Sequence, residues 1–274
     1  MHKKNITITD KMKGLNAACP YYTMFPLDFP LKCLSQASEN DVVLDPFCGR
    51  GTTIYAARLK RMKAYGVDSN PVAVAIAKAK LAYANVDEIT NLCEYILKEY
   101  DVSVKVPEGE FWDLCFSKKN LKEICQIREY LVNSKETDTT VLLRAIMMGI
   151  LHGPQLKNTK SYLSNQMPRT YATKPSSAIK YWKSRNLVPC EVDIQEIVRK
   201  KAILCLRDIP PKSKGLIMLS DSRKLKLNKK IKADWIITSP PYYGMRSYVP
   251  DQWLRYWFIG GPEDVVYSLP ENIK

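Results

Sequence analysis

The stretch Asp45-Pro-Phe-Cys-Gly-Arg-Gly-Thr52 decides the fold, because it joins two elements of different periodicity. The run before it, 41–45 (Asp-Val-Val-Leu-Asp), is short and apolar, as is typical of a buried strand. The run after it, 52–62, has apolar residues at helical spacing, and 63–68 then predicts a second strand. Strand, glycine-rich turn, helix and strand together predict a β–α–β unit and hence a parallel sheet.

The remaining elements follow the same reasoning outward from this unit. Pro71 stands where proline favours the first turn of a helix, which predicts a helix over 72–84. Continuous apolar runs predict two further buried strands, at 215–221 and 233–238. Other segments are expected to be helical, while 153–177 is expected to be loop-rich: the helices are 87–100, 118–133, 139–152, 192–207 and 251–259.

Composition excludes several classes of protein. The chain has 274 residues, 46% of them hydrophobic and 26% charged, as in an ordinary globular protein. No apolar run approaches the roughly 20 residues of a membrane span, and the first residues contain no signal-like apolar stretch. The eight cysteines form no C-x-x-C pair, and the only histidines are His2 and His152. These features predict a cytoplasmic protein with reduced cysteines, no membrane association and no metal site.

Positive charge is concentrated in one segment. Residues 157–232 hold 19 Lys and Arg against 5 Asp and Glu, a net charge of +14 that equals that of the whole chain. Tyr, Trp, Asn and Gln are interleaved with these cations, as in Lys180-Tyr-Trp-Lys-Ser-Arg185. Cations can neutralise phosphates, and aromatic or amide groups can contact bases. The segment therefore predicts contact with nucleic acid, the alternative being a solvated basic face.

The glycine-rich turn predicts a cofactor site. Gly49 and Gly51 lie between a strand and a helix, where the backbone can approach a ligand closely. A nicotinamide fingerprint would need a third glycine where Ile54 stands, so that cofactor is excluded. Asp68, at the end of the second strand, can accept from ribose hydroxyls, and Asp45 can face a cationic amine. S-adenosylmethionine has the required ribose, carboxylate and ammonium; the alternative is a purely structural turn.

A second motif, Ser239-Pro240-Pro241-Tyr242, follows the last predicted strand. Consecutive prolines have fixed φ angles and no N–H groups, so the segment presents a rigid array of carbonyl acceptors. Such an array, with the Ser239 hydroxyl, can hold an exocyclic amine, and Tyr242 offers a ring on which a flipped base can stack. A proline-rich turn without function is the alternative.

Taken together, Asp45-Pro-Phe-Cys-Gly-Arg-Gly-Thr52, Asp68 and Thr238-Ser-Pro-Pro-Tyr242 resemble the amino-group DNA methyltransferases, which methylate cytosine N4 or adenine N6. The segment 20–26 resembles the one that covers the methionine end of the cofactor, and 220–223 resembles the acidic turn that reads the adenine amine. The residues that the resemblance assigns to S-adenosylmethionine are Thr23, Phe25, Asp45, Phe47, Gly49, Gly51, Thr52, Asp68 and Asp221. Those that it assigns to the reacting base are Ser239, Pro240, Pro241 and Tyr242.

The resemblance also implies an α/β fold with a Rossmann-like class I methyltransferase sheet in the strand order 3-2-1-4. A family sheet has seven strands, so a second polypeptide or a C-terminal half is expected to supply the rest. The expected division is 1–104 for the cofactor part, 105–212 for a helical and basic insertion that contacts DNA, and 213–274 for the part with the Ser-Pro-Pro-Tyr motif.

Several functions stay open at this stage. Ser at position 239 is the commoner pattern for cytosine N4, so that product is favoured over N6-methyladenine. An RNA guanine-N2 methyltransferase is the nearest alternative, since similar proline motifs serve that chemistry. An inactive fragment, or the DNA-binding half of a split enzyme, is the other.

Overall fold

A computed structural model of the chain describes residues 14–20, 25–100, 102–153, 161–165, 167, 174–224, 232–240 and 251–265. The chain divides into two compact units. One comprises Met1–Asn85 and Ile203–Tyr243, and the other comprises Val86–Ala202 and Gly244–Lys274. The three-part division expected from the sequence stays a prediction.

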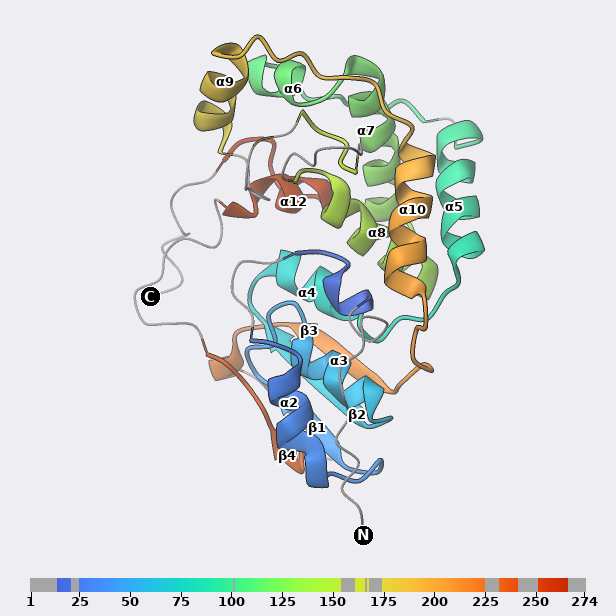
Figure 1. Cartoon of the computed structure of the whole chain (residues 1–274), viewed down its shortest axis with the longest axis vertical. Helices are drawn as coiled ribbons and strands as arrows, with labels where there is room; N and C mark the ends of the chain where they lie inside the picture. The colour runs from blue at the N-terminus through green and yellow to red at the C-terminus, as the bar shows by residue number, and fades with distance from the viewer. Residues whose placement is uncertain are drawn as a thin grey trace. The chain divides into compact units, whose positions relative to one another are not determined.

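The first unit is built on a four-stranded parallel sheet in the order β3-β2-β1-β4. Figure 1 shows β3, late in the chain and orange, beside the cyan β2. The Rossmann-like sheet and the strand order predicted from the sequence are therefore confirmed. The strands are β1 (Val42–Asp45), β2 (Lys63–Asp68), β3 (Gly215–Leu219) and β4 (Trp235–Ile236).

The β4 strand is shorter than the apolar run 233–238 predicted. It pairs with β1 over two residues, Val43↔Trp235 and Leu44↔Ile236. Backbone bonds flank this pair, from Asp234 to Val42 and from Ile237 to Leu44, at 2.9 and 3.2 Å.

Helices α3 (Thr52–Leu59) and α4 (Pro71–Lys78) cover the sheet. Helix α3 packs on β1 and β2, and α4 packs on β2 and β3. Right-handed crossovers that step in one direction along a sheet place their helices on the same face. Asn70 caps α4 by accepting from the N–H of Val72 at 2.9 Å, and Pro71 follows at the first helical position, as predicted.

Both helices end before the residues predicted from periodicity. In α3, Arg61 adopts a left-handed φ of 61°, and the N–H of Met62 bonds back to the carbonyl of Ala57 at 3.0 Å. This is the hydrogen bond of a Schellman ending, formed here without glycine. In α4, tight turns from Lys80 to Ala77 and from Leu81 to Lys78 replace the helical pattern.

A buried arginine ties the end of α4 to the chain that returns to the sheet. Arg58 is 1% exposed, and its guanidinium donates to the carbonyls of Lys80 and Ala82, both at 2.8 Å. It also donates to the carbonyls of Pro210 and Pro211, at 2.6 and 3.1 Å. Four carbonyl acceptors replace the carboxylate partner that a buried guanidinium usually needs. In the described residues before β1, the short helices are η1 (Leu15–Ala17), α2 (Asp28–Cys33) and η2 (Leu34–Gln36).

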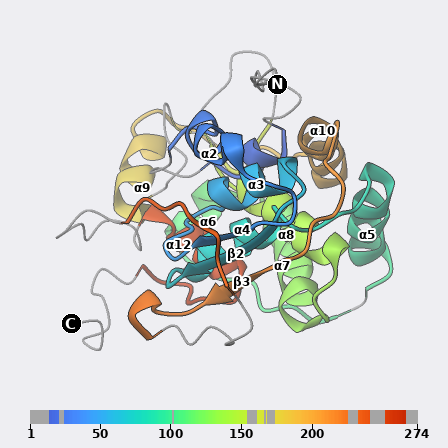
Figure 2. The same cartoon turned by 90° about the horizontal axis from the view of Figure 1, so that it is seen from below.

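The second unit is helical. Its helices are α5 (Val86–Lys98), α6 (Glu110–Cys115), α7 (Lys118–Asn133), α8 (Asp138–Ile150), α9 (Pro175–Lys183), α12 (Trp253–Phe258) and most of α10 (Ile194–Leu206). Figure 2 shows α5, α7 and α8 side by side, and α5 packs against both of the others. Helix α8 is buried on nearly all sides, as its continuous apolar sequence requires.

An aromatic cluster fills the other part of this unit. The ring of Trp112 lies 4.6 Å from that of Trp257 and 5.7 Å from that of Trp253, while Phe111 contacts Trp182 at 5.7 Å. These side chains come from α6, α9 and α12, so the cluster joins three short helices. The sequence did not predict α2, α6 or α9. In the part of the chain that the structure describes, no helix has the length and apolarity to cross a bilayer.

Candidate cofactor and base site

The site residues lie where the parallel strands of the first unit end. Asp45 ends β1, Asp68 ends β2, and Asp221 follows β3 by two residues. Ser239 follows β4 by three residues. The carboxyl ends of parallel strands meet at one edge of a sheet, where such folds bind their ligands. The structure therefore brings together residues that the sequence separates by as many as 194 positions.

The glycine turn is fixed by backbone hydrogen bonds. The N–H of Cys48 donates to the carbonyl of Val67, and the N–H of Gly51 to that of Cys48, both at 2.8 Å. Gly49 and Gly51 have φ angles of +50° and +82°, which side-chain-bearing residues rarely adopt. A Cβ at Gly51 would lie 3.0 Å from the Cα of Ala77, so that glycine lets α3 and α4 approach. A Cβ at Gly49 would meet nothing within 4 Å, which leaves room for a ligand beside the turn.

Asp45 presents a buried carboxylate oxygen. The residue is 1% exposed, and its Oδ1 accepts from the N–H of Phe47 at 3.1 Å. Its Oδ2 has no hydrogen-bond partner among the described residues. Burial raises the pKa of Asp45 to about 6, although the hydroxyls of Thr238 and Thr53 lower it in part. Neither hydroxyl makes a hydrogen bond of regular geometry to Oδ2, so this oxygen can accept a cation.

Asp68 is held in place by the turn itself. Its Oδ2 accepts from the N–H of Gly49 and its Oδ1 from the N–H of Asn70, each at 2.8 Å. Burial raises the pKa of this carboxyl, and the N–H groups of Asn70 and Gly49 oppose that change. Each oxygen keeps a further lone pair, so a fixed Asp68 can still accept from two ribose hydroxyls.

The carboxylate of Asp221 forms an ion pair with Arg223. The guanidinium of Arg223 lies 2.7 Å from its Oδ2, and the N–H of Arg223 donates to its Oδ1 at 2.9 Å. Arg223 lowers the pKa of Asp221 to about 2, so the carboxylate is ionised. The hydroxyl of Ser222 also donates to the carbonyl of Pro46, which joins the turn after β3 to the glycine turn. The sequence motif gave no sign of the Asp221–Arg223 pair.

The end of β4 is tied to the start of α3. The hydroxyl of Thr53 donates to the carbonyl of Ile237 at 3.3 Å. Ser239 and Pro240 are exposed, while Pro241 and Tyr242 lie outside the described residues. Sequence reasoning missed Thr53 and Thr238 as neighbours of Asp45, although each stands next to a motif residue that it named.

The other predicted cofactor residues are placed as follows. Phe47 is 38% exposed and Thr52 is 4% exposed, both in the glycine turn or directly after it. Phe25 is partly exposed and packs edge-to-face on Phe29 with ring centres 5.3 Å apart. Thr23 lies outside the described residues.

These features fit S-adenosylmethionine on two counts. The buried Oδ2 of Asp45, without a hydrogen-bond partner in the described ranges, matches the ammonium of the methionine group, which would supply one. The open space beside Gly49 and the lone pairs of Asp68 match a ribose held close to the backbone. In the described part of the chain, no group of three or more His, Cys, Asp or Glu could hold a metal ion.

Two buried cations beside the turn were not predicted. Arg50, between the two glycines, is 5% exposed and donates to the carbonyl of Cys19 at 3.5 Å. Burial lowers the pKa of Arg50 to about 10. Lys80 is fully buried, and its Nζ donates to the carbonyl of Leu15 at 2.6 Å. The segment that precedes α2 is thus held through its own carbonyls, that of Cys19 to the glycine turn and that of Leu15 to the residue just after α4.

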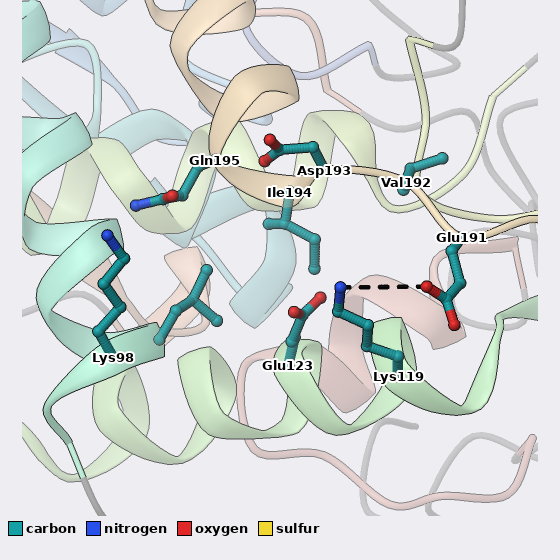
Figure 3. A pocket seen from close by; sticks show the side chains of 9 residues that line it. Lys98, Lys119, Glu123, Glu191, Val192, Asp193, Ile194 and Gln195 are labelled. Atoms are coloured by element: carbon teal, nitrogen blue, oxygen red, sulfur yellow. Dashed lines mark ion pairs between the residues drawn. The ribbon is translucent and has the colours of Figure 1, made fainter.

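The second unit has a groove of about 460 Å³ that none of the motif residues lines. Figure 3 shows its mixture of charges, with an ion pair of 4.0 Å between Lys119 and Glu191. Burial raises the pKa of Glu123 in its wall. The groove is lined by Leu97, Lys98, Lys119, Glu123 and residues 191–195. Its acidic and basic side chains already face one another, so we assign it no ligand.

Comparison with protein families gives one match. Residues 2–79 match the family model described as DNA methylase. The matched part contains the glycine turn and Asp68, and ends before Asp221 and Ser239. No curated protein and no solved structure matches the chain.

Proposed function

We propose that this chain, which its residues 2–79 identify as a member of the amino-group DNA methyltransferase family, uses S-adenosylmethionine to methylate the exocyclic amine of a flipped base. The observation that carries the proposal is the buried Oδ2 of Asp45, which has no hydrogen-bond partner in the part of the chain that the structure describes. It lies beside the glycine turn, at the sheet edge from which Ser239 follows β4. The carboxylate that can bind a cation and the serine that can bind an amine thus both lie at the carboxyl ends of the parallel strands.

The chain's own residues would bind and orient the two reactants. Asp45 would bind the ammonium of the cofactor, and Asp68 its ribose hydroxyls. When bound, S-adenosylmethionine supplies a methyl group activated by a sulfonium. The hydroxyl of Ser239 and the carbonyls around Pro240 would accept from the N–H groups of the target amine and so direct its lone pair. Tyr242 would stack on the flipped base.

Asp221 would read the adenine amine of the cofactor. Its carboxylate already accepts from Arg223, so it would use a remaining lone pair or exchange partners. The serine at position 239 favours cytosine N4 over adenine N6 as the methylated atom, by resemblance to the family.

The test is transfer of a labelled methyl group to DNA, followed by digestion and separation of the nucleosides. N4-methylcytosine as the product supports the proposal in full, and N6-methyladenine would overturn the choice of base. Higher incorporation into transfer RNA than into duplex DNA would favour the guanine-N2 alternative. A Ser239→Ala variant should lose most of its turnover and keep its affinity for the cofactor, because Ser239 faces the amine.

The exposed edge of β4 suggests a binding partner for the sheet. Strand β4 lies at one end of the sheet, and its Ile236 is 66% exposed. An apolar edge strand with unpaired backbone groups is a template for another strand. We propose that a second polypeptide, or a further C-terminal segment, pairs with β4. Methyl transfer by the purified chain alone, at the rate obtained with its genomic neighbour present, would overturn this part.

The proposed place of action is the cytoplasm. The eight cysteines all lie in described residues and form no disulfide bond there, and seven of them are buried or partly buried. Free thiols are typical of a reducing compartment.

A further inference from the structure

Helix α9 is anchored on one side and exposed on the other. Trp182 and Ala178 are both 0% exposed, and the Trp182 ring lies 5.7 Å from that of Phe111 in α6. Lys180, Lys183 and Arg185, at the end of the helix and just after it, are exposed. The anchored face fixes the helix on the core of the second unit, so the exposed cations have a rigid base.

Two of the basic residues around α9 have their charge compensated. Lys174 Nζ lies 3.4 Å from Oδ1 of Asp251, and Lys183 pairs with Glu110. These ion pairs fasten α9 to the beginning of α12 and to α6. They are therefore structural contacts within the second unit, and they leave little charge for a partner.

Lys180 and Arg185 differ from these two. Neither forms an ion pair with an Asp or Glu among the described residues. The guanidinium of Arg185 instead lies 4.2 Å from the ring centre of Tyr181 and donates to the hydroxyl of Ser184 at 3.2 Å. A guanidinium held against a ring keeps its remaining N–H groups in a fixed plane, which suits a phosphate oxygen.

We propose that Lys180 and Arg185 bind the phosphate backbone of DNA, with Tyr181 holding the guanidinium in place. This inference rests on the proposed function, because it assumes that DNA is the substrate. It narrows the predicted DNA contact from the whole basic segment 157–232 to the end of α9. Lys200, which forms a 3.2 Å ion pair with Glu196, is assigned no phosphate.

The test compares two double variants that remove the same charge from the same basic segment. One is Lys180→Ala with Arg185→Ala, and its control is Arg199→Ala with Lys200→Ala, both exposed positions on α10. The affinity for a short duplex DNA is measured as a function of salt concentration. Each lost phosphate contact lowers the slope of log affinity against log salt by about 1.

We expect the α9 variant to lower the slope by about 2 and to weaken binding. The α10 control should keep the wild-type slope. An unchanged slope in the α9 variant, or an equal loss in the control, would overturn the inference while the proposed function stands. A wild-type chain that does not bind DNA even with its genomic neighbour present would overturn both.

Two further variants separate phosphate binding from folding. Arg185→Lys keeps the charge and should keep the slope, with a loss of affinity because lysine cannot stack its planar group on Tyr181. Tyr181→Leu should weaken binding and leave the circular dichroism spectrum and the thermal midpoint unchanged. If Tyr181→Leu binds DNA as the wild type does, the role given to the ring is wrong.

Discussion

The carboxylate of Asp68 accepts a hydrogen bond from the backbone N–H of Gly49 at 2.8 Å, so the end of β2 fixes the turn that follows β1. The N–H of Cys48 reinforces the link by donating to the carbonyl of Val67, also at 2.8 Å. A ligand that bonds to Asp68 would therefore meet a turn that is already in its final conformation. Such preorganisation lowers the entropic cost of binding.

Replacement of Asp45 by asparagine should weaken S-adenosylmethionine binding by about 10- to 100-fold. The amide would place a donor or a neutral oxygen where the ammonium needs a charged acceptor, a difference of about 1.5–3 kcal/mol. Titration calorimetry with the cofactor measures the change. Asp41→Asn is the matched control, because Asp41 precedes β1 at the opposite end of the strand and bonds to Trp235 at 2.8 Å. Equal affinities of the Asp45 variant and the wild type would contradict the assigned role.

The stability of the chain without cofactor should decrease as the pH rises from about 4 to about 6. Burial raises the pKa of Asp45 to about 6 from its usual value near 4, so the folded state binds the proton more tightly than the unfolded state. The stabilisation is therefore complete below pH 4 and is lost as the pH passes 6, with a total near 3 kcal/mol. Urea unfolding at several pH values measures it, and the contribution should be absent in Asp45→Asn. A wild-type profile parallel to that of the variant would show that Asp45 titrates normally.

Alanine should be tolerated much less well at Gly51 than at Gly49. Both positions have positive φ, which costs a side-chain-bearing residue about 1–2 kcal/mol. At Gly51 the added Cβ would also lie 3.0 Å from the Cα of Ala77, whereas at Gly49 it meets nothing within 4 Å. We expect Gly51→Ala to lower the free energy of unfolding by at least about 2 kcal/mol and Gly49→Ala by about 1 kcal/mol. Chemical denaturation of the two variants tests this order, and the reverse order would refute the packing argument.

Arg58→Met should reduce the free energy of unfolding by about 3 kcal/mol or more. The change leaves four carbonyls without their donor, among them those of Lys80 and Pro210, and buried acceptors that lose a partner are costly. Arg61→Met is the control, since Arg61 is exposed, and it should change stability by less than about 0.5 kcal/mol. Thermal and urea unfolding give the comparison. Similar losses in both variants would mean that the four hydrogen bonds of the Arg58 guanidinium contribute nothing beyond what an exposed arginine does.

The sequence predicted the elements that rest on local patterns. Asn70 and Pro71 set the start of α4, and the apolar runs around the glycine turn set β1 and β2. The sequence predicted less well the helix ends and the helices that depend on tertiary contacts. The Schellman ending at Arg61 shortened α3, and α9 is a helix held by Trp182 against Phe111. Its first residues fall in a segment predicted to be loop-rich.

In the candidate site too, the sequence predicted some residues and missed others. The motifs named Asp45, Gly49, Gly51 and Asp68, and the family match covers all four. Their roles stay predictions. The buried cations Arg50, Arg58 and Lys80 were not predicted, because Lys and Arg are usually exposed and nothing in a local pattern marks the exceptions.

The sequence by itself predicted the parallel sheet, because strand, glycine turn and helix are patterns of neighbouring residues, and its resemblance to a family of known sheet predicted the strand order. Only the tertiary structure decided that Oδ2 of Asp45 is buried without a hydrogen-bond partner among the described residues and that Arg223 pairs with Asp221. It alone separated Lys174 and Lys183, which form ion pairs, from Lys180 and Arg185, which form none with the acidic residues that the structure describes. Burial and charge pairing depend on groups that are far apart along the chain, so no reading of adjacent residues could supply them.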